Sequence, residues 1–396
     1  MSFEIVYAKE PFPKQVVRTI FLAGPTPRGE GESWRKEFLN ALEELDYDGH
    51  VFVPEPRDGK WEDDYTSQVD WEEEGLKKAD CISFWVPRDI DGTKGTKLPA
   101  FTTNDEWGVW KESGKVVWGA PEDVEKVRYQ EFYAKKYKVP MASTIKDTAK
   151  AALEMTKNSA LRKDGETYIP LCIWHKPEFQ SWYDSLKAAG NRLDSADLKW
   201  AFWSTKRDSL IMYALRVNVF VEKEQRNKEN EVVIFRPDIA SALLYYPAND
   251  VLDTEIVIVK EFRSPVRNQE GFVFELPGGS STDKMSLKKM VAQEVKEECE
   301  LSIDESRLKQ VSSRQLTSTL SAHVGSVFVV ELTEAEINQV KMYEKAGDAF
   351  GVSGSSEFTY PTVRTVRSLL YGKDVDWSTI GMIMSTIEYE IGFGNW

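Results

Sequence analysis

The chain has 396 residues, of which 41% are apolar, and carries a formal net charge of −14 at neutral pH. This length allows two ordinary domains, and the acidic balance argues against a nucleic-acid polymer as partner, because polymer binding relies on cationic neutralisation of phosphates. No apolar run of roughly 18 residues and no signal pattern is present, so we expect a cytoplasmic protein that does not bind a membrane. The three cysteines are scattered along the chain, which predicts reduced thiols.

Residues 1–156 predict an α/β domain. The expected elements are a short strand ending in a Gly-Pro turn at 16–28, a helix from near Ser33, a helix at 70–80, a strand at 81–87, a turn at 102–108 that opens another helix, and a strand at 113–121. This alternation predicts a doubly wound parallel sheet of the flavodoxin or Rossmann type, with helices on both faces. Ligands of such sheets lie at the carboxyl ends of the strands, and Glu106 is expected at one of these ends.

Five short elements occur in order within this domain: PheLeuAlaGlyPro at 21–25, Trp34–Arg35, Pro54–Glu55, Trp71–Glu72, and ThrAsnAspGluTrpGly at 103–108. They resemble the nucleoside 2-deoxyribosyltransferase superfamily over about residues 16–155. The resemblance implies that Glu106 is the nucleophile that attacks the anomeric carbon and that Glu72 lies near the departing base. It also implies a substrate site formed by Gly24, Pro25, Thr26, Arg35, Asn104 and Gly108.

Two carboxylates are what a retaining N-glycosidic cleavage requires, because one forms a glycosyl ester while the other gives a proton to the leaving base. Asp70 competes with Glu72 for the proton-donating role, and we expect Asp80 to orient a strand end. Small nucleosides or nucleotides are the expected partners. The identity of the base, the choice between ribose and deoxyribose, and the acceptor, water or a second base, stay open.

Residues 157–213 form a connecting region without an assigned role. A polar stretch at 157–166 precedes an aromatic, helix-like segment at 174–191. So many aromatic side chains predict that the segment packs between domains or forms a dimer surface. We therefore expect a homo-oligomer.

Residues 214–396 predict a second domain. Strands are expected near 215–222, 231–238 and 241–246, then a strand and basic turn at 255–267, and a strand at 271–279 that enters a glycine turn. The following helix places Glu294, Glu297 and Glu298 on one face, because residues three and four apart are neighbours on a helix. Such a face suits Mg²⁺, or Mn²⁺, bound together with substrate phosphates.

The segment from Gly278 to Leu301 resembles the Nudix box. It keeps the family pattern at Gly279, Glu294, Val295, Glu297, Glu298 and Leu301, and departs from it at Met285, Gln293 and Glu300. The resemblance implies an α/β/α sandwich with a mixed sheet and a metal site at Gly278, Glu294, Glu297 and Glu298. The preceding strands look like the ADP-ribose pyrophosphatase branch, which implies that Arg263, Arg267 and Glu275 hold a nucleoside diphosphate sugar. It further implies that Glu357, in the loop 351–359 before a helix-like segment at 363–370, activates water.

Together these features predict a bifunctional nucleotide-processing enzyme: an N-glycosidic hydrolase or transferase joined to a Mg²⁺-dependent hydrolase acting on ADP-ribose or an NAD-related metabolite. A rival interpretation has two domains that act on separate deoxynucleotide substrates. A second rival is a nucleotide sensor, motivated by Met285 and Gln293, in which the C-terminal domain binds without cutting and regulates the first.

Overall fold

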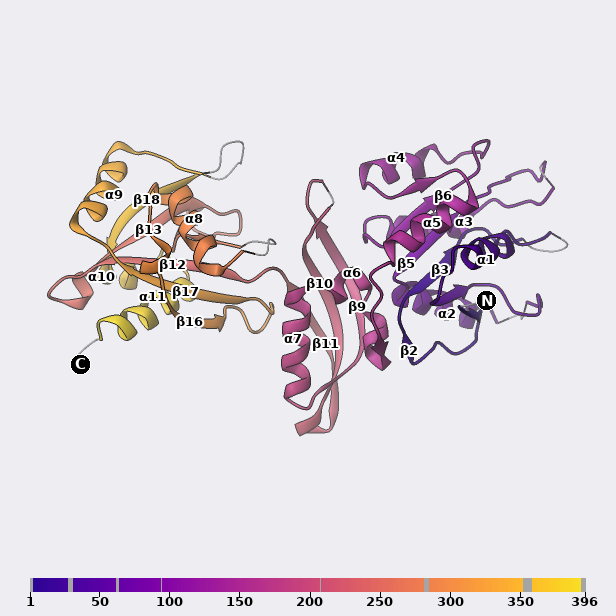
Figure 1. The fold of residues 1–396 in the computed structure, drawn as a ribbon, viewed down its shortest axis with the longest axis horizontal. Coiled ribbons are helices and arrows are strands. Elements are labelled where there is room, and N and C mark those ends of the chain that lie inside the picture. Colours follow the sequence, from indigo (N-terminus) through magenta and orange to yellow (C-terminus); the bar gives the residue numbers. More distant parts are fainter. Residues whose placement is uncertain are drawn as a thin grey trace. The chain divides into compact units, whose positions relative to one another are not determined.

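The computed structural model describes residues 3–27, 31–61, 64–93, 95–206, 208–280, 285–351 and 358–392. It divides into two compact units, Met1–Phe235 and Arg236–Trp396 (Figure 1). The sequence predicts a boundary after residue 213 instead. The difference arises because the strand near 215 pairs with a strand of the connecting region, and the strand near 231 pairs with the strand near 215, so both belong to unit 1. Among the described helices, none is both long and apolar enough to cross a bilayer.

Unit 1 is built on a six-stranded sheet in the order β1-β4-β3-β5-β6-β7, and every pair in it is parallel. Its strands are β1 (Glu4–Tyr7), β3 (Thr19–Ala23), β4 (His50–Val53), β5 (Cys81–Trp85), β6 (Val116–Gly119) and β7 (Met141–Ala142). The central strands β3 and β5 are buried at every position, as expected for strands covered on both faces. A small ribbon pairs β2 (Gln15–Val16) with β8 (Arg162–Lys163).

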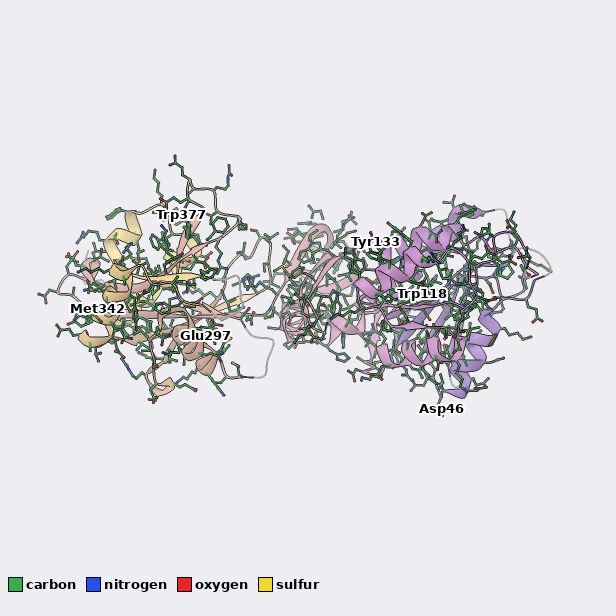
Figure 2. All side chains as sticks on the ribbon, turned by 90° about the horizontal axis from the view of Figure 1, so that it is seen from above. Asp46, Trp118, Tyr133, Glu297, Met342 and Trp377 are labelled. Atoms are coloured by element: carbon green, nitrogen blue, oxygen red, sulfur yellow. The ribbon has the colours of Figure 1, made fainter. Side chains whose placement is uncertain are left out.

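Helices cover both faces of this sheet, as the sequence predicts. Apolar residues of α1 (Arg35–Glu44) and α5 (Ile145–Met155) share one core with the sheet. Residues of α2 (Tyr65–Lys78), α3 (Phe101–Trp110) and α4 (Arg128–Lys136) share the other, which includes Trp118 of β6; Figure 2 labels Trp118 together with Tyr133 of α4. Helix α2 begins where the Asp64 side chain accepts a hydrogen bond from the Ser67 amide.

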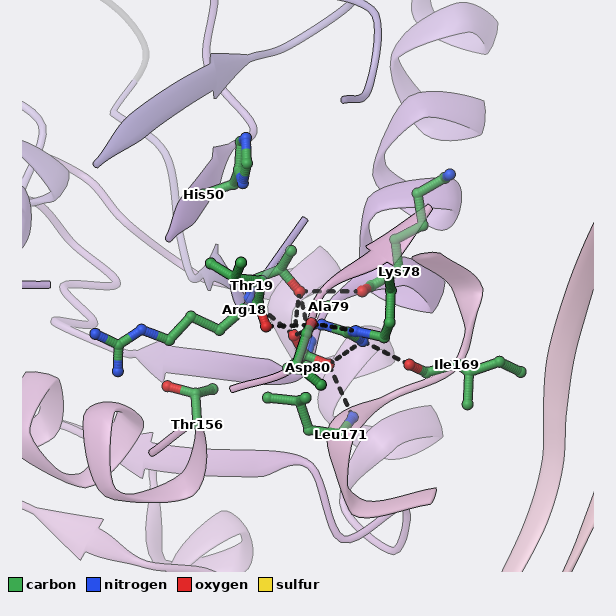
Figure 3. Close-up of polar contacts among 12 residues, drawn as sticks. Arg18, Thr19, His50, Lys78, Ala79, Asp80, Thr156, Ile169 and Leu171 are labelled. Carbon is green, nitrogen blue, oxygen red and sulfur yellow. Dashed lines mark hydrogen bonds and ion pairs between the residues drawn. The ribbon is translucent and has the colours of Figure 1, made fainter. Parts of the chain in front are cut away.

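Asp80 orients the start of β5, which confirms the role predicted for it (Figure 3). Its carboxylate accepts hydrogen bonds from the Thr19 amide at 2.8 Å and the Leu171 amide at 2.9 Å. Arg162 forms a two-point ion pair with the same carboxylate, and both side chains are fully buried. This contact ties the chain after residue 156 to the parallel sheet.

The connecting region folds into the rest of unit 1. It contains the 3₁₀ helix η1 (Asp164–Tyr168) and the helices α6 (Leu171–Trp174) and α7 (Pro177–Ala188). The strands β9 (Arg192–Trp203), β10 (Leu210–Val221) and β11 (Arg226–Phe235) form an antiparallel sheet in the order β11-β10-β9, with a 3₁₀ turn, η2 (Glu222–Glu224), between the last two. Phe179 and Trp182 of α7 pack on Phe235 of this sheet, where Tyr213 stacks on Phe235 at 5.0 Å between ring centroids.

Unit 2 contains a seven-stranded mixed sheet. Its main path is β14-β13-β12-β17-β16; β15 also pairs with β12, β18 pairs with β13, and the β12–β17 pair is parallel. The strands are β12 (Ile239–Tyr246), β13 (Glu255–Phe262), β14 (Phe272–Glu275), β15 (Gly278–Gly279), β16 (Lys309–Gln315), β17 (Val324–Glu331) and β18 (Thr359–Thr365). Residues 363–365, expected to be helical, end β18, because β-branched Val363 and Thr365 fit a strand paired with β13.

Two helical layers enclose this sheet. On one side lie α8 (Leu287–Cys299) and α9 (Glu334–Ala346), and on the other α10 (Val366–Tyr371) and α11 (Trp377–Glu390). The short 3₁₀ turns η3 (Val251–Asp253) and η4 (Glu305–Arg307) precede β13 and β16. Helix α9 begins in a capping box between Thr333 and Glu336. Met342 of α9 and Trp377 of α11 are both exposed, and Figure 2 labels them with Glu297 of α8.

Candidate active site

Glu72 and Glu106 line the same cavity of unit 1, which has a volume of about 750 Å³. Helix α2 supplies Glu72, helix α3 supplies Glu106, and residues 197–201 of β9 form a further wall. The cavity falls in the size range of small-molecule sites. The structure therefore brings the two predicted carboxylates to one space.

Glu106 lies within a helix and not at a strand end. The sequence predicts a turn over 102–108, but α3 already begins at Phe101. The chain reverses earlier, where Asp89 and Leu98 form an isolated antiparallel bridge, and Ala100 then adopts a left-handed conformation with φ of 58°. Glu106 is consequently held on the second turn of α3, facing the cavity.

The pKa of Glu106 is raised to about 8, mainly by burial, with a smaller contribution from the nearby charge of Glu72 and a still smaller one from Asp105. The Arg35 guanidinium acts in the opposite direction and lowers it. Glu72 itself accepts a hydrogen bond from the Gln68 side-chain amide at 2.8 Å. Two carboxylates that influence each other in one cavity are typical of acid–base and nucleophilic sites.

Arg35 is almost fully buried, at 1% exposure, and holds the loop that follows β3. Its guanidinium donates to the Leu22 carbonyl at 3.0 Å, the Gly24 carbonyl at 2.8 Å and the Thr26 hydroxyl at 3.1 Å. A 2.6 Å ion pair with Glu55 compensates its charge. Arg35, predicted to bind substrate, thus has its donors directed at the protein and positions the loop.

The Gly-Pro turn after β3 requires glycine. Gly24 has φ of 149°, and a Cβ atom there would lie 2.2 Å from the Trp85 carbonyl oxygen and 2.8 Å from the Trp34 ring. The carbonyl of the adjacent Pro25 accepts a hydrogen bond from the Trp34 indole at 2.9 Å. The turn is therefore packed tightly against the end of β5, where the chain order of the sheet reverses direction.

Three other predicted residues lie outside the lining of this cavity. The Asn104 side-chain oxygen accepts hydrogen bonds from Arg88, in the loop before α3, and from Gln130 of α4. These bonds link α3 to segments that precede and follow it in the sequence. Gly108 is exposed, and a Cβ atom added to it would meet nothing within 4 Å. Asp70, the competitor of Glu72, is exposed on α2 and does not line the cavity.

A second cavity of unit 1, of about 540 Å³, lies nearer the carboxyl ends of the strands. It is lined by Trp34 and by residues that follow β5 and β6, among them Arg88 and Pro121. The described residues that line it include neither Glu72 nor Glu106.

The sequence did not reveal one contribution to the first cavity, the β9 wall, which lies in the region without an assigned role. The sequence also did not reveal that Lys115, which is 1% exposed and not part of the cavity lining, caps α2: its ammonium donates to the Leu76, Lys77 and Ala79 carbonyls at 2.7 to 3.0 Å. Burial lowers the pKa of Lys115 to about 8. A lysine before a strand carries no signal in the sequence for such a cap.

In unit 2, carboxylates gather at the glycine turn before α8. Glu298 accepts a hydrogen bond from the Gly278 amide at 3.0 Å, and a Cβ atom on Gly279 would lie 2.2 Å from the Glu294 carboxylate. The pKa of Glu298 is raised to about 8, mainly by burial and in part by the charges of Glu294 and Glu261. A side chain at residue 279 would therefore have to displace the Glu294 carboxylate from the turn.

Glu297 differs from its two neighbours, since it accepts a hydrogen bond from the Gln293 side chain at 2.7 Å. Met285, at a family glutamate position, packs on the apolar core instead of pairing with Gln293. Within the described part of the chain, no group of three or more His, Cys, Asp or Glu side chains is arranged to hold a metal ion. The side-chain positions described here thus do not assemble the predicted metal site.

The predicted ligand residues of unit 2 are partly brought together. Arg263 forms an ion pair with Glu275 at 2.8 Å and another with the buried Glu261 at 2.9 Å. Arg267 is exposed in the turn between β13 and β14. Glu357 lies outside the described residues.

The fold and the paired glutamates define the first part of unit 1 as an α/β domain with a candidate glycosidic site. Residues 17–124 match the family model described as nucleoside 2-deoxyribosyltransferase like, so unit 1 contains a nucleoside 2-deoxyribosyltransferase-like domain. The match includes both Glu72 and Glu106 and covers no residue of unit 2. No similar sequence was found among curated proteins.

Proposed function

We propose that unit 1 cleaves or transfers the N-glycosidic bond of a nucleoside or nucleotide, with Glu106 as nucleophile and Glu72 as proton donor. The observation that supports this most is that one cavity holds both carboxylates and that each influences the other. Both glutamates lie within the segment that matches the nucleoside 2-deoxyribosyltransferase-like family, which supports the same reaction class. Glu72 is preferred to Asp70 because only Glu72 lines the cavity.

In this reaction a carboxylate oxygen of Glu106 forms a bond to the anomeric carbon as the bond between that carbon and the base nitrogen breaks. The electron pair of the broken bond goes to the base, and Glu72 supplies a proton to it. Water or a second base then attacks the anomeric carbon and releases Glu106, so the sugar keeps its configuration. Arg35 keeps the Gly-Pro loop in place during both steps through its contacts with Leu22 and Gly24.

The pKa of Glu106 predicts how the rate of base release depends on pH. With a pKa of about 8, the carboxyl group of the free protein is mainly protonated at neutral pH and becomes a nucleophile as the pH rises. Cleavage needs an ionised Glu106 together with a protonated Glu72, so the rate kcat/KM for base release should rise towards pH 8 and fall again at higher pH, where both carboxyl groups are ionised. A rate that stays level well above pH 8 would remove Glu72 as the proton donor.

Substitution tests the assignment directly. Glu106→Ala should abolish base release, whereas Asp70→Asn, which changes an exposed carboxylate of the same helix as Glu72, should leave it nearly unchanged. Glu72→Gln should slow poor leaving bases by about 10²- to 10⁴-fold and activated ones much less. Base release by Glu106→Ala at the parental rate would remove Glu106 from the mechanism.

We infer a second candidate function for unit 2: Mg²⁺-dependent hydrolysis of a nucleoside diphosphate-linked compound such as ADP-ribose, in a domain of the Nudix type. The supporting observation is the crowding of Glu261, Glu294 and Glu298, whose mutual repulsion a bound cation would relieve. The mixed sheet between two helical layers is compatible with a domain of the Nudix type. With unit 1, this would make the chain a bifunctional nucleotide-processing enzyme.

Product analysis after incubation with ADP-ribose, with Mg²⁺ or Mn²⁺ and without either, tests the second function. Metal-dependent cleavage that is lost in Glu298→Gln and kept in Glu305→Gln, an exposed glutamate of η4, supports a hydrolase. Binding of ADP-ribose without cleavage at any metal concentration supports the sensor alternative, in which unit 2 regulates unit 1.

A further inference from the structure

The cavity that holds Glu72 and Glu106 exposes aromatic rings. Tyr65 of α2 is 66% exposed and Trp200 of β9 is 40% exposed, and both belong to its lining. Exposed rings of this kind offer flat apolar faces on which a heterocyclic base can stack. Trp200 lies beyond the matched family segment, so this feature is supplied by the β9 sheet.

The same lining is strongly acidic. Among the described residues that line it, six carry carboxylates and two carry ammonium groups: Glu72, Glu73, Asp105, Glu106, Glu112 and Asp197 against Lys77 and Lys199. Both lysines are already paired with carboxylates of the lining, Lys77 with Glu73 at 2.6 Å and Lys199 with Asp197. The nearby cation Arg35 is bound to Glu55 behind the loop.

Acidic walls of this composition attract cationic ligands and repel anionic ones. A phosphate group brings about 1.5 to 2 negative charges at neutral pH and would meet a wall of the same sign. A cation is attracted both by the carboxylates and by the faces of aromatic rings. A neutral ligand gains neither advantage.

We propose that this cavity selects nucleosides whose base carries a positive charge and whose sugar lacks a 5′-phosphate. The proposal rests on the proposed glycosidic function of Glu106 and specifies its substrate class. Trp200 and Tyr65 contact the base, and the carboxylates of α2 and α3 compensate its charge.

A cationic base needs only Glu106 as nucleophile and does not need a proton from Glu72. When the Glu106 carboxylate attacks the anomeric carbon, the electron pair of the breaking bond neutralises the base, so the leaving group needs no proton. A positive charge in the cavity also favours the ionised form of Glu106 against the opposing influence of burial, Glu72 and Asp105, and acts in the same direction as Arg35. Binding of a cation should consequently release a proton from the protein near pH 7.

Three related probes separate charge from shape: nicotinamide riboside, with a cationic base; its dihydro form, with a neutral base of similar outline; and nicotinamide mononucleotide, which adds a 5′-phosphate. Calorimetry on the full chain should show that nicotinamide riboside binds about tenfold more tightly than either other probe. The preference should shrink when the ionic strength rises from about 0.05 to 0.5 M, because salt screens charges. Equal or tighter binding of the dihydro form or the mononucleotide overturns the proposal.

Variants locate the effect in the cavity. Asp105→Asn should reduce the preference for the cationic probe over the dihydro form several-fold. Trp200→Ala should weaken the binding of both probes. Phe202→Ala is the matched control, because this exposed aromatic residue lies on the same strand outside the lining and should change neither. Identical effects of Trp200→Ala and Phe202→Ala would contradict the assigned site.

Base release distinguishes this inference from the proposed function. If the cationic probe binds preferentially but Glu106→Ala and the wild type release base equally, the glycosidic function fails and the binding inference stands. If neutral nucleosides or nucleotides are cleaved faster than cationic nucleosides in a Glu106-dependent manner, the function stands and the inference fails.

Discussion

Replacing Glu106 by glutamine should make unit 1 more stable, and the gain should grow with pH. The carboxyl group has a pKa of about 8 in the folded protein and an ordinary value of 4.5. Between these values the unfolded chain is ionised and the folded one is protonated, so stability falls as the pH rises. The two pKa values differ by an equivalent of about 5 kcal/mol, which we reduce to about 2 to 3 kcal/mol because Glu106 is partly exposed to the cavity.

Hydrogen exchange of the β3 and β5 amides, followed by mass spectrometry, measures the opening of unit 1 in the full chain. The free energy of opening in Glu106→Gln should match the wild type near pH 4.5 and exceed it by about 2 to 3 kcal/mol at pH 8 and above. Glu112→Gln, an exposed carboxylate of the same cavity, serves as control and should change stability by no more than about 0.5 kcal/mol. A difference between Glu106→Gln and wild type that does not vary with pH would refute the reasoning.

Three further predictions concern packing and charge. Asp80→Asn should destabilise unit 1 by about 3 to 5 kcal/mol, because it leaves the buried Arg162 unpaired. Asp48→Asn, which changes a carboxylate that is 66% exposed, should cost less than about 1 kcal/mol in the same exchange experiment. Glu300→Gly should stabilise unit 2 by about 1 kcal/mol, since Glu300 ends α8 in a left-handed conformation with φ of 52°; an unchanged midpoint of urea unfolding would contradict this. Gly24→Ala should lower the thermal midpoint and abolish base release together, because its Cβ overlaps the Trp85 carbonyl; a fully active, equally stable variant would show that the loop is not constrained.

The sequence predicts the parallel sheet of unit 1 well, because its strands are short, mostly apolar and separated by helices. It also predicts that Glu72 and Glu106 meet, since each belongs to a recognisable motif on a neighbouring element. The sequence does not predict that Glu106 lies inside a helix that begins at Phe101. The reversal that precedes α3 uses Asp89, Leu98 and a left-handed Ala100, and alanine gives no signal for a turn.

Contacts between distant segments explain most of what the sequence left open. Arg162 is 82 residues from its partner Asp80, and nothing local marks either as half of a buried ion pair. The strands β10 and β11 were predicted as strands, but strand patterns do not reveal which sheet they join, so the boundary between the units was placed too early. Trp200 in β9 reads from sequence as one more aromatic residue of an unassigned region, although it lines the cavity of the paired glutamates.

The ion pair between Asp80 and Arg162 has a consequence for how this protein can be divided or recombined. A fragment that stops at residue 156 would retain both glutamates and the whole matched segment. It would leave the buried Asp80 carboxylate without Arg162, and it would lack the β9 wall of the cavity. The matched family segment is therefore not an interchangeable module here. Grafting this site onto another protein would require the chain through the end of β11, where unit 1 ends.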